Sequence, residues 1–304
     1  MNAMNKMKRV ITVFYKCKAT ITFLLLIVIL GCHPSKHHSG KPLITVSILP
    51  QKYFVEKIAG DKYDVNVMVP PGASHENYDP TPEQIVGLSN AVVYFRVGNI
   101  DFEKTWIQKF SENYPDLKFV TLSKKLDLIE SADDNHHHGQ TEPHTWMSPG
   151  NVKSMAKIIY ETLVEMDMKN ESFYTLNYKQ FVQELDSLTE LVRTKFQHSK
   201  SNSFIIYHPA LTYYARDFGL IQWAIELEGK SPSVQHIRDL IDIAKREKIK
   251  AVLVQKQFDV SKAETIASEI DGIVIEIDPL NENWSKEIVD ITNKLSEAFN
   301  KQSN

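Results

Sequence analysis

The chain is very poor in cysteine. Its 304 residues include only Cys17 and Cys32, and both lie near the N-terminus. We predict that Cys17 belongs to a removable leader and that the sulfur of Cys32 is lipidated. The folded part of the protein would then contain no free thiol. A disulfide framework and a thiolate metal site are then both excluded. Any metal ion must be held by nitrogen and oxygen ligands.

Acidic residues are absent from residues 1–31, which carry five basic ones: Lys6, Lys8, Arg9, Lys16 and Lys18. The apolar run Ile21–Leu30 is short for a membrane span, so we interpret residues 1–31 as a signal peptide. The run ends in Leu30-Gly31-Cys32, which resembles the lipobox of bacterial lipoproteins. Cleavage before Cys32 and lipidation of its sulfur would anchor the protein to a membrane, with residues 32–42 as a polar tether. The alternative is an uncleaved N-terminal helix with an incidental cysteine.

The mature chain also lacks an excess of positive charge. Removing the leader leaves 35 − 5 = 30 basic residues against 38 acidic ones, a formal charge of −8. A strongly acidic protein is repelled by phosphate backbones, which argues against nucleic acid as a partner.

Residues 151–197 contain no proline and almost no strand signal, and they separate two similar patterns. Each pattern has four short, β-branched apolar runs alternating with helical segments, which predicts an α/β protein with two lobes and largely parallel four-stranded sheets. We place the lobes at residues 43–170 and 199–304. Apolar residues recurring every two to four positions predict one long helix over residues 171–198, which either joins the lobes or is an ordinary surface helix. The strand runs are residues 43–48, 63–69, 91–97, 118–122, 203–207, 220–225, 250–255 and 272–277.

Candidate ligands follow several of these runs. Parallel sheets collect ligands beyond the carboxyl ends of their strands. His208-Pro209, Asp278-Pro279 and His75-Glu76 each follow a predicted strand, and His144 lies in a short loop stiffened by Pro143. Any one of these histidines could be a structural or polar loop residue. Four candidates from four distant segments nevertheless favour a preorganised metal site.

The three consecutive histidines, His136, His137 and His138, are a different feature. Adjacent side chains diverge and cannot easily converge on one ion. Their neighbours are polar, which is typical of a solvated loop. The loop either has no role or collects metal weakly as an auxiliary site.

The chain resembles the zinc and manganese solute-binding proteins of bacterial ABC importers. Four motifs carry the resemblance, and it extends from about Ile44 to the C-terminus. They are PPGASHENYDPTPEQ (70–84), EPHTW (142–146), YHPALTYYARDFGL (207–220) and IDPL (277–280). The family has two α/β lobes bridged by one long rigid helix, with the metal in the cleft between them. The resemblance implies that His144, His208 and Asp278 are ligands and that residues 133–138 match the family's His-rich and acid-rich loop.

One motif departs from the family pattern. The family usually has Gly-x-Ser-Pro-His-x-Tyr, whereas here Ser74 is followed by His75, Glu76, Asn77 and Tyr78. An ungapped match puts Glu76 at the position of the first ligand. We predict His75 as that ligand and keep Glu76 as the alternative, because imidazole suits Zn²⁺ better in a site that already holds one carboxylate.

These residues predict a membrane-anchored receptor outside the cytoplasm, periplasmic or at the cell surface, that captures Zn²⁺ and delivers it to an ABC permease. We expect a monomer. Ligation by His75, His144, His208 and Asp278 suits Zn²⁺, whereas Glu76 in place of His75 would favour Mn²⁺ or Fe²⁺. Four protein ligands leave no position for an activated water, which argues against an enzyme. The alternatives are a zinc hydrolase with Glu76 as general base, and an adhesin or scaffold lipoprotein with an incidental metal.

Overall fold

The computed structural model describes residues 40–130, 141–226 and 232–301. The predicted signal peptide, Cys32 and the auxiliary histidines His136, His137 and His138 therefore lie outside the described residues. Among the helices that are described, none combines the length and apolar character needed to cross a membrane.

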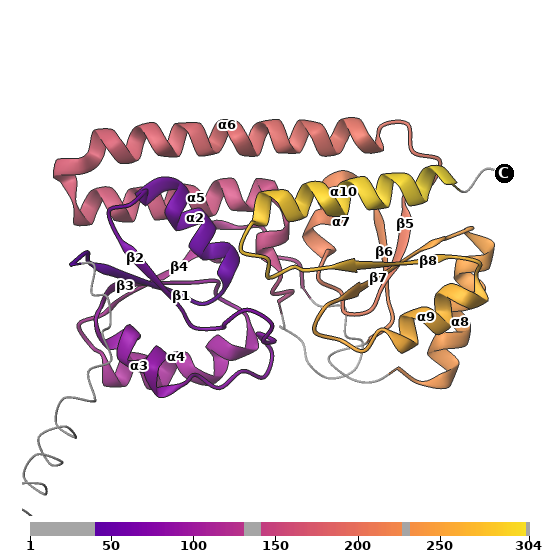
Figure 1. Cartoon of the computed structure of the whole chain (residues 1–304), viewed down its shortest axis with the longest axis horizontal. Helices are drawn as coiled ribbons and strands as arrows, with labels where there is room; N and C mark the ends of the chain where they lie inside the picture. Colours follow the sequence, from indigo (N-terminus) through magenta and orange to yellow (C-terminus); the bar gives the residue numbers. More distant parts are fainter. Residues whose placement is uncertain (1–39, 131–140, 227–231, 302–304) are drawn as a thin grey trace, which may run out of the picture. The chain divides into compact units, whose positions relative to one another are not determined.

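The N-terminal lobe is built on a four-stranded parallel sheet in the order β2-β1-β3-β4 (Figure 1). Helices connect successive strands, as parallel pairing requires. The central strands carry Ile44, Val46 and Val93, which are fully buried because both faces of the sheet are covered. The elements are β1 (Leu43–Val46), α2 (Leu49–Ala59), β2 (Asp64–Val67), α3 (Pro82–Ser89), β3 (Ala91–Arg96), α4 (Asp101–Asn113), β4 (Lys118–Thr121) and the 3₁₀ turn η1 (Leu122–Lys125).

The C-terminal lobe repeats this topology. Its sheet is also parallel and has the order β6-β5-β7-β8, the same permutation as in the first sheet. The predicted fold class of two α/β lobes with four-stranded sheets is confirmed. The elements are β5 (Ser203–Ile206), α7 (Thr212–Phe218), β6 (Ile221–Ala224), α8 (Val234–Arg246), β7 (Ala251–Gln255), α9 (Ser261–Glu269), β8 (Ile273–Ile277) and α10 (Trp284–Asn300).

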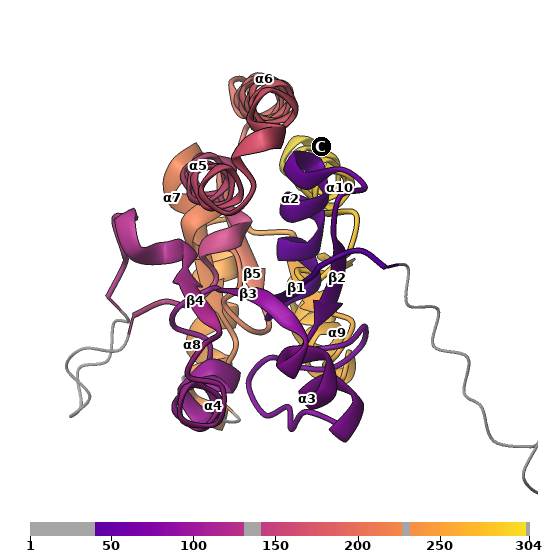
Figure 2. The ribbon, with the colours of Figure 1, turned by 90° about the vertical axis from the view of Figure 1, so that its left-hand side faces the viewer.

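A long helix, α6 (Glu171–Phe196), joins the lobes. Its 26 residues span about 39 Å at 1.5 Å per residue. The helix packs on α2 and α5 (Pro149–Met166) of the N-terminal lobe and on α7 and α10 of the C-terminal lobe. Figure 2 shows α6 above α5 on one side and above α2 and α10 on the other. Its buried stripe consists of Tyr174, Phe181, Leu185, Leu188 and Val192. The predicted linking helix is present, and it contacts both lobes as a bridge must.

Two tryptophans form hydrogen bonds between the lobes. Trp146 lies in the 3₁₀ turn η2 (Thr145–Met147), and its indole N–H donates to the carbonyl oxygen of Pro279 at 2.8 Å. The indole N–H of Trp284 donates back to the carbonyl oxygen of Trp146, also at 2.8 Å. Residues 41–304 form a single compact unit. The lobe boundaries at residues 170 and 199 therefore stay a prediction.

Candidate metal centre

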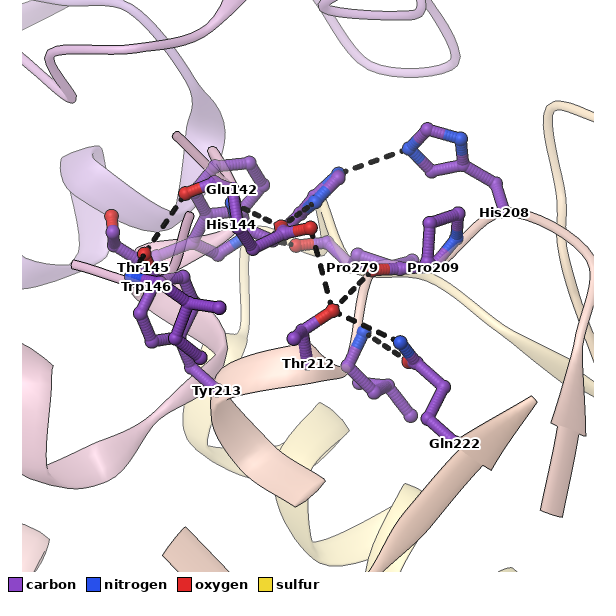
Figure 3. Close-up of polar contacts among 12 residues, drawn as sticks. Glu142, His144, Thr145, Trp146, His208, Pro209, Thr212, Tyr213, Gln222 and Pro279 are labelled. Carbon is purple, nitrogen blue, oxygen red and sulfur yellow. Dashed lines mark hydrogen bonds and ion pairs between the residues drawn. The ribbon is translucent and has the colours of Figure 1, made fainter. Parts of the chain in front are cut away.

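Three of the predicted ligands, His75, His144 and His208, meet between the lobes. Each offers a ring nitrogen within 4.8 Å of the others, and each residue is less than a tenth exposed. The Nε2 atoms of His144 and His208 are 3.2 Å apart (Figure 3). Two nitrogens bound to one tetrahedral zinc ion at about 2.05 Å would lie about 3.3 Å apart. The spacing of the two rings therefore fits a single shared ion.

His75 is placed by a turn and by packing. After β2 the chain turns through Gly72, which has a φ of +80° that favours glycine. The carbonyl oxygen of His75 then accepts the N–H of Phe102, in the first turn of α4, at 3.0 Å. The His75 ring packs edge-on against Trp146, with ring centroids 5.4 Å apart. These contacts turn the His75 side chain towards the other two histidines.

His144 is held by the acidic residue two positions before it. Oε1 of Glu142 lies 2.5 Å from Nδ1 of His144 and also accepts the backbone N–H of His144 at 2.9 Å. Burial opposes ionisation of Glu142, but the charge and hydrogen bonds of His144 outweigh it and lower the pKa of this carboxyl. Tyr213 donates its hydroxyl to the carbonyl oxygen of Glu142 at 3.0 Å. Glu142 is thus an ionised acceptor that fixes the ring of His144.

His208 follows β5 directly and is clamped by the end of β7. The side-chain amide of Gln255 accepts the N–H of His208 at 3.3 Å and donates to its carbonyl oxygen at 2.5 Å. The ring stacks on Phe258, with centroids 5.5 Å apart. Nδ1 of His208 lies 3.2 Å from Oε1 of Glu76 and 3.3 Å from Oε2 of Glu226. The Nε2 atom is thereby left facing His144.

The three rings are not electrostatically equivalent. Burial, together with the nearby His144 and His208, holds the pKa of His75 well below its usual value. Burial would also lower the pKa of His208, but the hydrogen bond to Glu226 and the charge of Glu76 raise it above the usual value. A histidine must be neutral to bind a metal ion. Compared with a free histidine, His75 becomes neutral at a lower pH and His208 at a higher pH.

Glu76, the alternative first ligand, lies on the far side of His208 from the histidine cluster. It belongs with His208 and Glu226 to a second group of potential ligand atoms within 4.8 Å of one another. Burial raises the pKa of the Glu76 carboxyl. In this structure His75 contacts the other two histidines, and Glu76 approaches the Nδ1 atom of His208.

Asp278, the fourth predicted ligand, belongs to neither group among the described residues. Its Oδ1 accepts the N–H of Leu280 at 3.2 Å, and its Oδ2 lies 3.9 Å from Nζ of Lys256. The residues directly after it, Pro279 and Leu280, do line the small cavity at the histidines. The structure thus brings the Asp278 loop to the site with its carboxylate turned to other partners.

The cavity formed by these residues suits one ion. Its volume is about 20 Å³, and its lining includes His75, His144, His208, Phe258 and Leu280. A single water or a comparably small cation fills such a space. Three imidazoles that line one small cavity form a nitrogen-rich site, which Zn²⁺ accepts readily.

Two carboxylates at this centre were not assigned a role from the sequence. Glu142 lies inside the EPHTW motif, where its proximity to His144 was a usable signal. Glu226 follows the predicted strand 220–225, so the rule that found His208 and Asp278 applied to it equally. Each carboxylate contacts the Nδ1 atom of a candidate ligand, Glu142 that of His144 and Glu226 that of His208.

The comparisons with known proteins match this fold. Residues 44–299 match the family model described as zinc-uptake complex component A, periplasmic. The ZnuA high-affinity zinc uptake protein of Bacillus subtilis is 29% identical over 259 residues, which cover 80% of each chain. The PsaA manganese ABC transporter substrate-binding lipoprotein of Streptococcus mitis is 27% identical over 265 residues, covering 82% of this chain and 84% of PsaA. A zinc-bound crystal structure of a ZnuA deletion mutant has a TM-score of 0.80 and 35% identity, and covers 85% of this chain and 98% of that one.

Two α/β lobes joined by one long helix, with clustered histidines between them, define a metal-binding protein of the solute-binding class of ABC importers. The chain belongs to the ZnuA family, whose model matches most of its length. This family consists of uptake components and not of enzymes, which excludes the zinc hydrolase alternative.

Proposed function

We propose that this protein captures Zn²⁺ in the cleft between its lobes and delivers it to an ABC permease. The observation that carries the proposal is the cluster of three buried histidines, with the Nε2 atoms of His144 and His208 3.2 Å apart. Nitrogen ligands favour Zn²⁺ over the harder Mn²⁺. His75, His144 and His208 would bind the ion as cargo.

The fourth ligand in this proposal is Asp278. Its loop reaches the cavity through Pro279 and Leu280. The carboxylate is also partly exposed and is not locked in a buried ion pair. A small rotation of the Asp278 side chain would break its hydrogen bond with the N–H of Leu280 and bring the carboxylate to the ion. The ion would then have a tetrahedral set of three nitrogen ligands and one oxygen ligand.

The alternative cargo is Mn²⁺ or Fe²⁺, and it is favoured by the two carboxylates, Glu76 and Glu226, close to His208. Oxygen ligands suit these harder ions. The deciding experiment is calorimetric competition between Zn²⁺ and Mn²⁺ on protein purified without added metal. We expect one equivalent of Zn²⁺ to displace Mn²⁺, whereas preferential retention of Mn²⁺ would reverse the assignment. A protein without a tight site for either ion would contradict the uptake function itself.

The remaining parts of the proposal concern the cell envelope. The lipobox-like segment ending at Cys32 and the lipoprotein name of the Streptococcus mitis relative both support a lipid anchor outside the cytoplasm. We propose that the protein acts there as a monomer that meets its permease partner at the membrane surface. Cys32→Ser should release the protein from the membrane fraction, and size-exclusion chromatography with light scattering would measure its oligomeric state.

A further inference from the structure

The buried carboxylate of Glu226 lies beside Nδ1 of His208, the ring nitrogen that does not face His144. Glu226 is 5% exposed and follows β6. Its backbone N–H donates to the carbonyl oxygen of Tyr207 at 2.8 Å, which fixes Glu226 beside the end of β5. The Oε2 atom of Glu226 is 3.3 Å from Nδ1 of His208, while Nε2 of the same ring faces His144. One nitrogen of His208 thus faces a carboxylate and the other faces the ion cavity.

The chemistry of imidazole makes these two contacts dependent on each other. A neutral ring carries one proton, and a metal ion binds the nitrogen that lacks it. A carboxylate can only accept a hydrogen bond, so Glu226 favours the form with the proton on Nδ1. That form leaves the lone pair of Nε2 free for the ion.

We propose that Glu226 is a positioning residue for metal binding, which selects the Nδ1–H form of His208 and orients its ring. This inference rests on the proposed function. Glu142 contacts Nδ1 of His144 in the same way. Three neutral imidazoles bring no charge to a divalent cation, so the carboxylates of Glu142 and Glu226 also offset the charge of the ion.

Glu76 competes for the same Nδ1 atom but is the weaker partner. Its side chain is 26% exposed, against 6% for that of Glu226, and water screens an exposed carboxylate more strongly. Glu76 also comes from the N-terminal lobe, whereas Glu226 shares the C-terminal lobe with His208. The contact to Glu226 therefore persists if the lobes move relative to each other.

The test compares Glu226→Gln and Glu226→Leu with a matched control, Glu276→Gln. Glu276 is an exposed residue of β8 in the same lobe, so its substitution removes one charge without touching His208. We expect Glu226→Gln to raise the Kd for Zn²⁺ about tenfold and Glu226→Leu to raise it further, because glutamine keeps a weaker acceptor. Glu276→Gln should bind Zn²⁺ like the wild type.

A second readout separates positioning from a merely structural role. Nitrogen-15 NMR of the histidine rings in the zinc-loaded protein should show His208 bound through Nε2, with a slowly exchanging Nδ1 proton. In Glu226→Gln that proton should exchange faster, whereas a structural role would only lower the melting temperature. If Glu226→Leu does not fold, the isosteric Glu226→Gln carries the test.

Three results bear on the inference and the proposed function separately. Wild-type Zn²⁺ affinity in Glu226→Gln would overturn the inference alone. Zinc bound to Nδ1 of His208 with Glu76 and Glu226 would overturn it too, since these carboxylates would then be ligands. A wild-type protein that binds no Zn²⁺ would instead contradict the proposed function.

Discussion

The Nε2 atoms of His144 and His208 lie 3.2 Å apart, although 64 positions separate the two residues in the chain. Each ring is backed by a carboxylate at Nδ1, Glu142 for His144 and Glu226 for His208. Both rings therefore present Nε2 to one point between the lobes. A site assembled in this way requires both lobes.

His75 and Glu76 should respond differently to mutation. His75→Ala removes a buried ring from the cluster, so we expect Zn²⁺ affinity to fall more than tenfold, about 1.4 kcal/mol or more. Glu76→Ala removes a partly exposed carboxylate from behind His208 and should change the affinity only a few-fold. Isothermal titration with Zn²⁺ measures both. The opposite order of effects would restore the ungapped motif alignment and make Glu76 the ligand.

Zinc binding should weaken as the pH falls, and His208 should respond first. A bound imidazole is deprotonated, so protons compete with the ion below the pKa of each ligand. The pKa of His208 is raised and that of His75 is lowered, so protonation of His208 begins above the usual value of about 6.5 while His75 stays neutral. Affinity measured between pH 8 and pH 5 should fall by up to tenfold per unit. A flat profile would contradict histidine ligation.

Asp278→Asn isolates the ligand role of this residue. Asparagine keeps an Oδ1 acceptor for the N–H of Leu280, so the loop and the melting temperature of the metal-free protein should be preserved. The substitution removes the negative charge, and we expect Zn²⁺ affinity to fall about tenfold. Unchanged affinity in a normally folded variant would mean that water or another group completes the site.

Deleting residues 133–138 should leave tight one-to-one Zn²⁺ binding intact. The histidines of this segment, His136 to His138, lie outside the described residues, whereas the three clustered histidines come from other segments. The deletion should remove only weak additional binding, which native mass spectrometry at rising Zn²⁺ concentration would count. Loss of the tight site would show that the roles of residues 133–138 and of the histidine cluster had been assigned the wrong way round.

Trp146→Phe should destabilise the fold. The substitution leaves the carbonyl oxygen of Pro279 without its donor between the lobes, which costs about 1–3 kcal/mol when the group is buried. Urea unfolding of the metal-free protein measures the change in the free energy of unfolding. Trp106→Phe is the matched control, because the indole of Trp106 donates to Asp79 at an exposed site. Equal effects of the two substitutions would argue against a role for Trp146 in holding the lobes together.

The elements of the fold follow from local sequence signals. Each predicted strand is a short apolar run, and the alternation of such runs with longer helical patterns indicates an α/β fold with parallel sheets. The linking helix follows from its apolar spacing, and its observed limits, Glu171–Phe196, differ from the prediction by two residues at the C-terminal end. His208 was predicted as a ligand because ligands gather beyond the carboxyl ends of parallel strands, and its position directly after β5 agrees with that prediction.

The direction of individual side chains was decided only by tertiary structure. His75 and Glu76 are adjacent polar residues in a turn, and the sequence left both as candidates for the first ligand. Packing of the His75 ring on Trp146 and the hydrogen bond from Phe102 turn the imidazole inward. Asp278 follows its strand as expected, yet its carboxylate accepts the N–H of Leu280. Such choices depend on partners far away in the chain or on competing hydrogen bonds of similar free energy, which a local pattern does not encode.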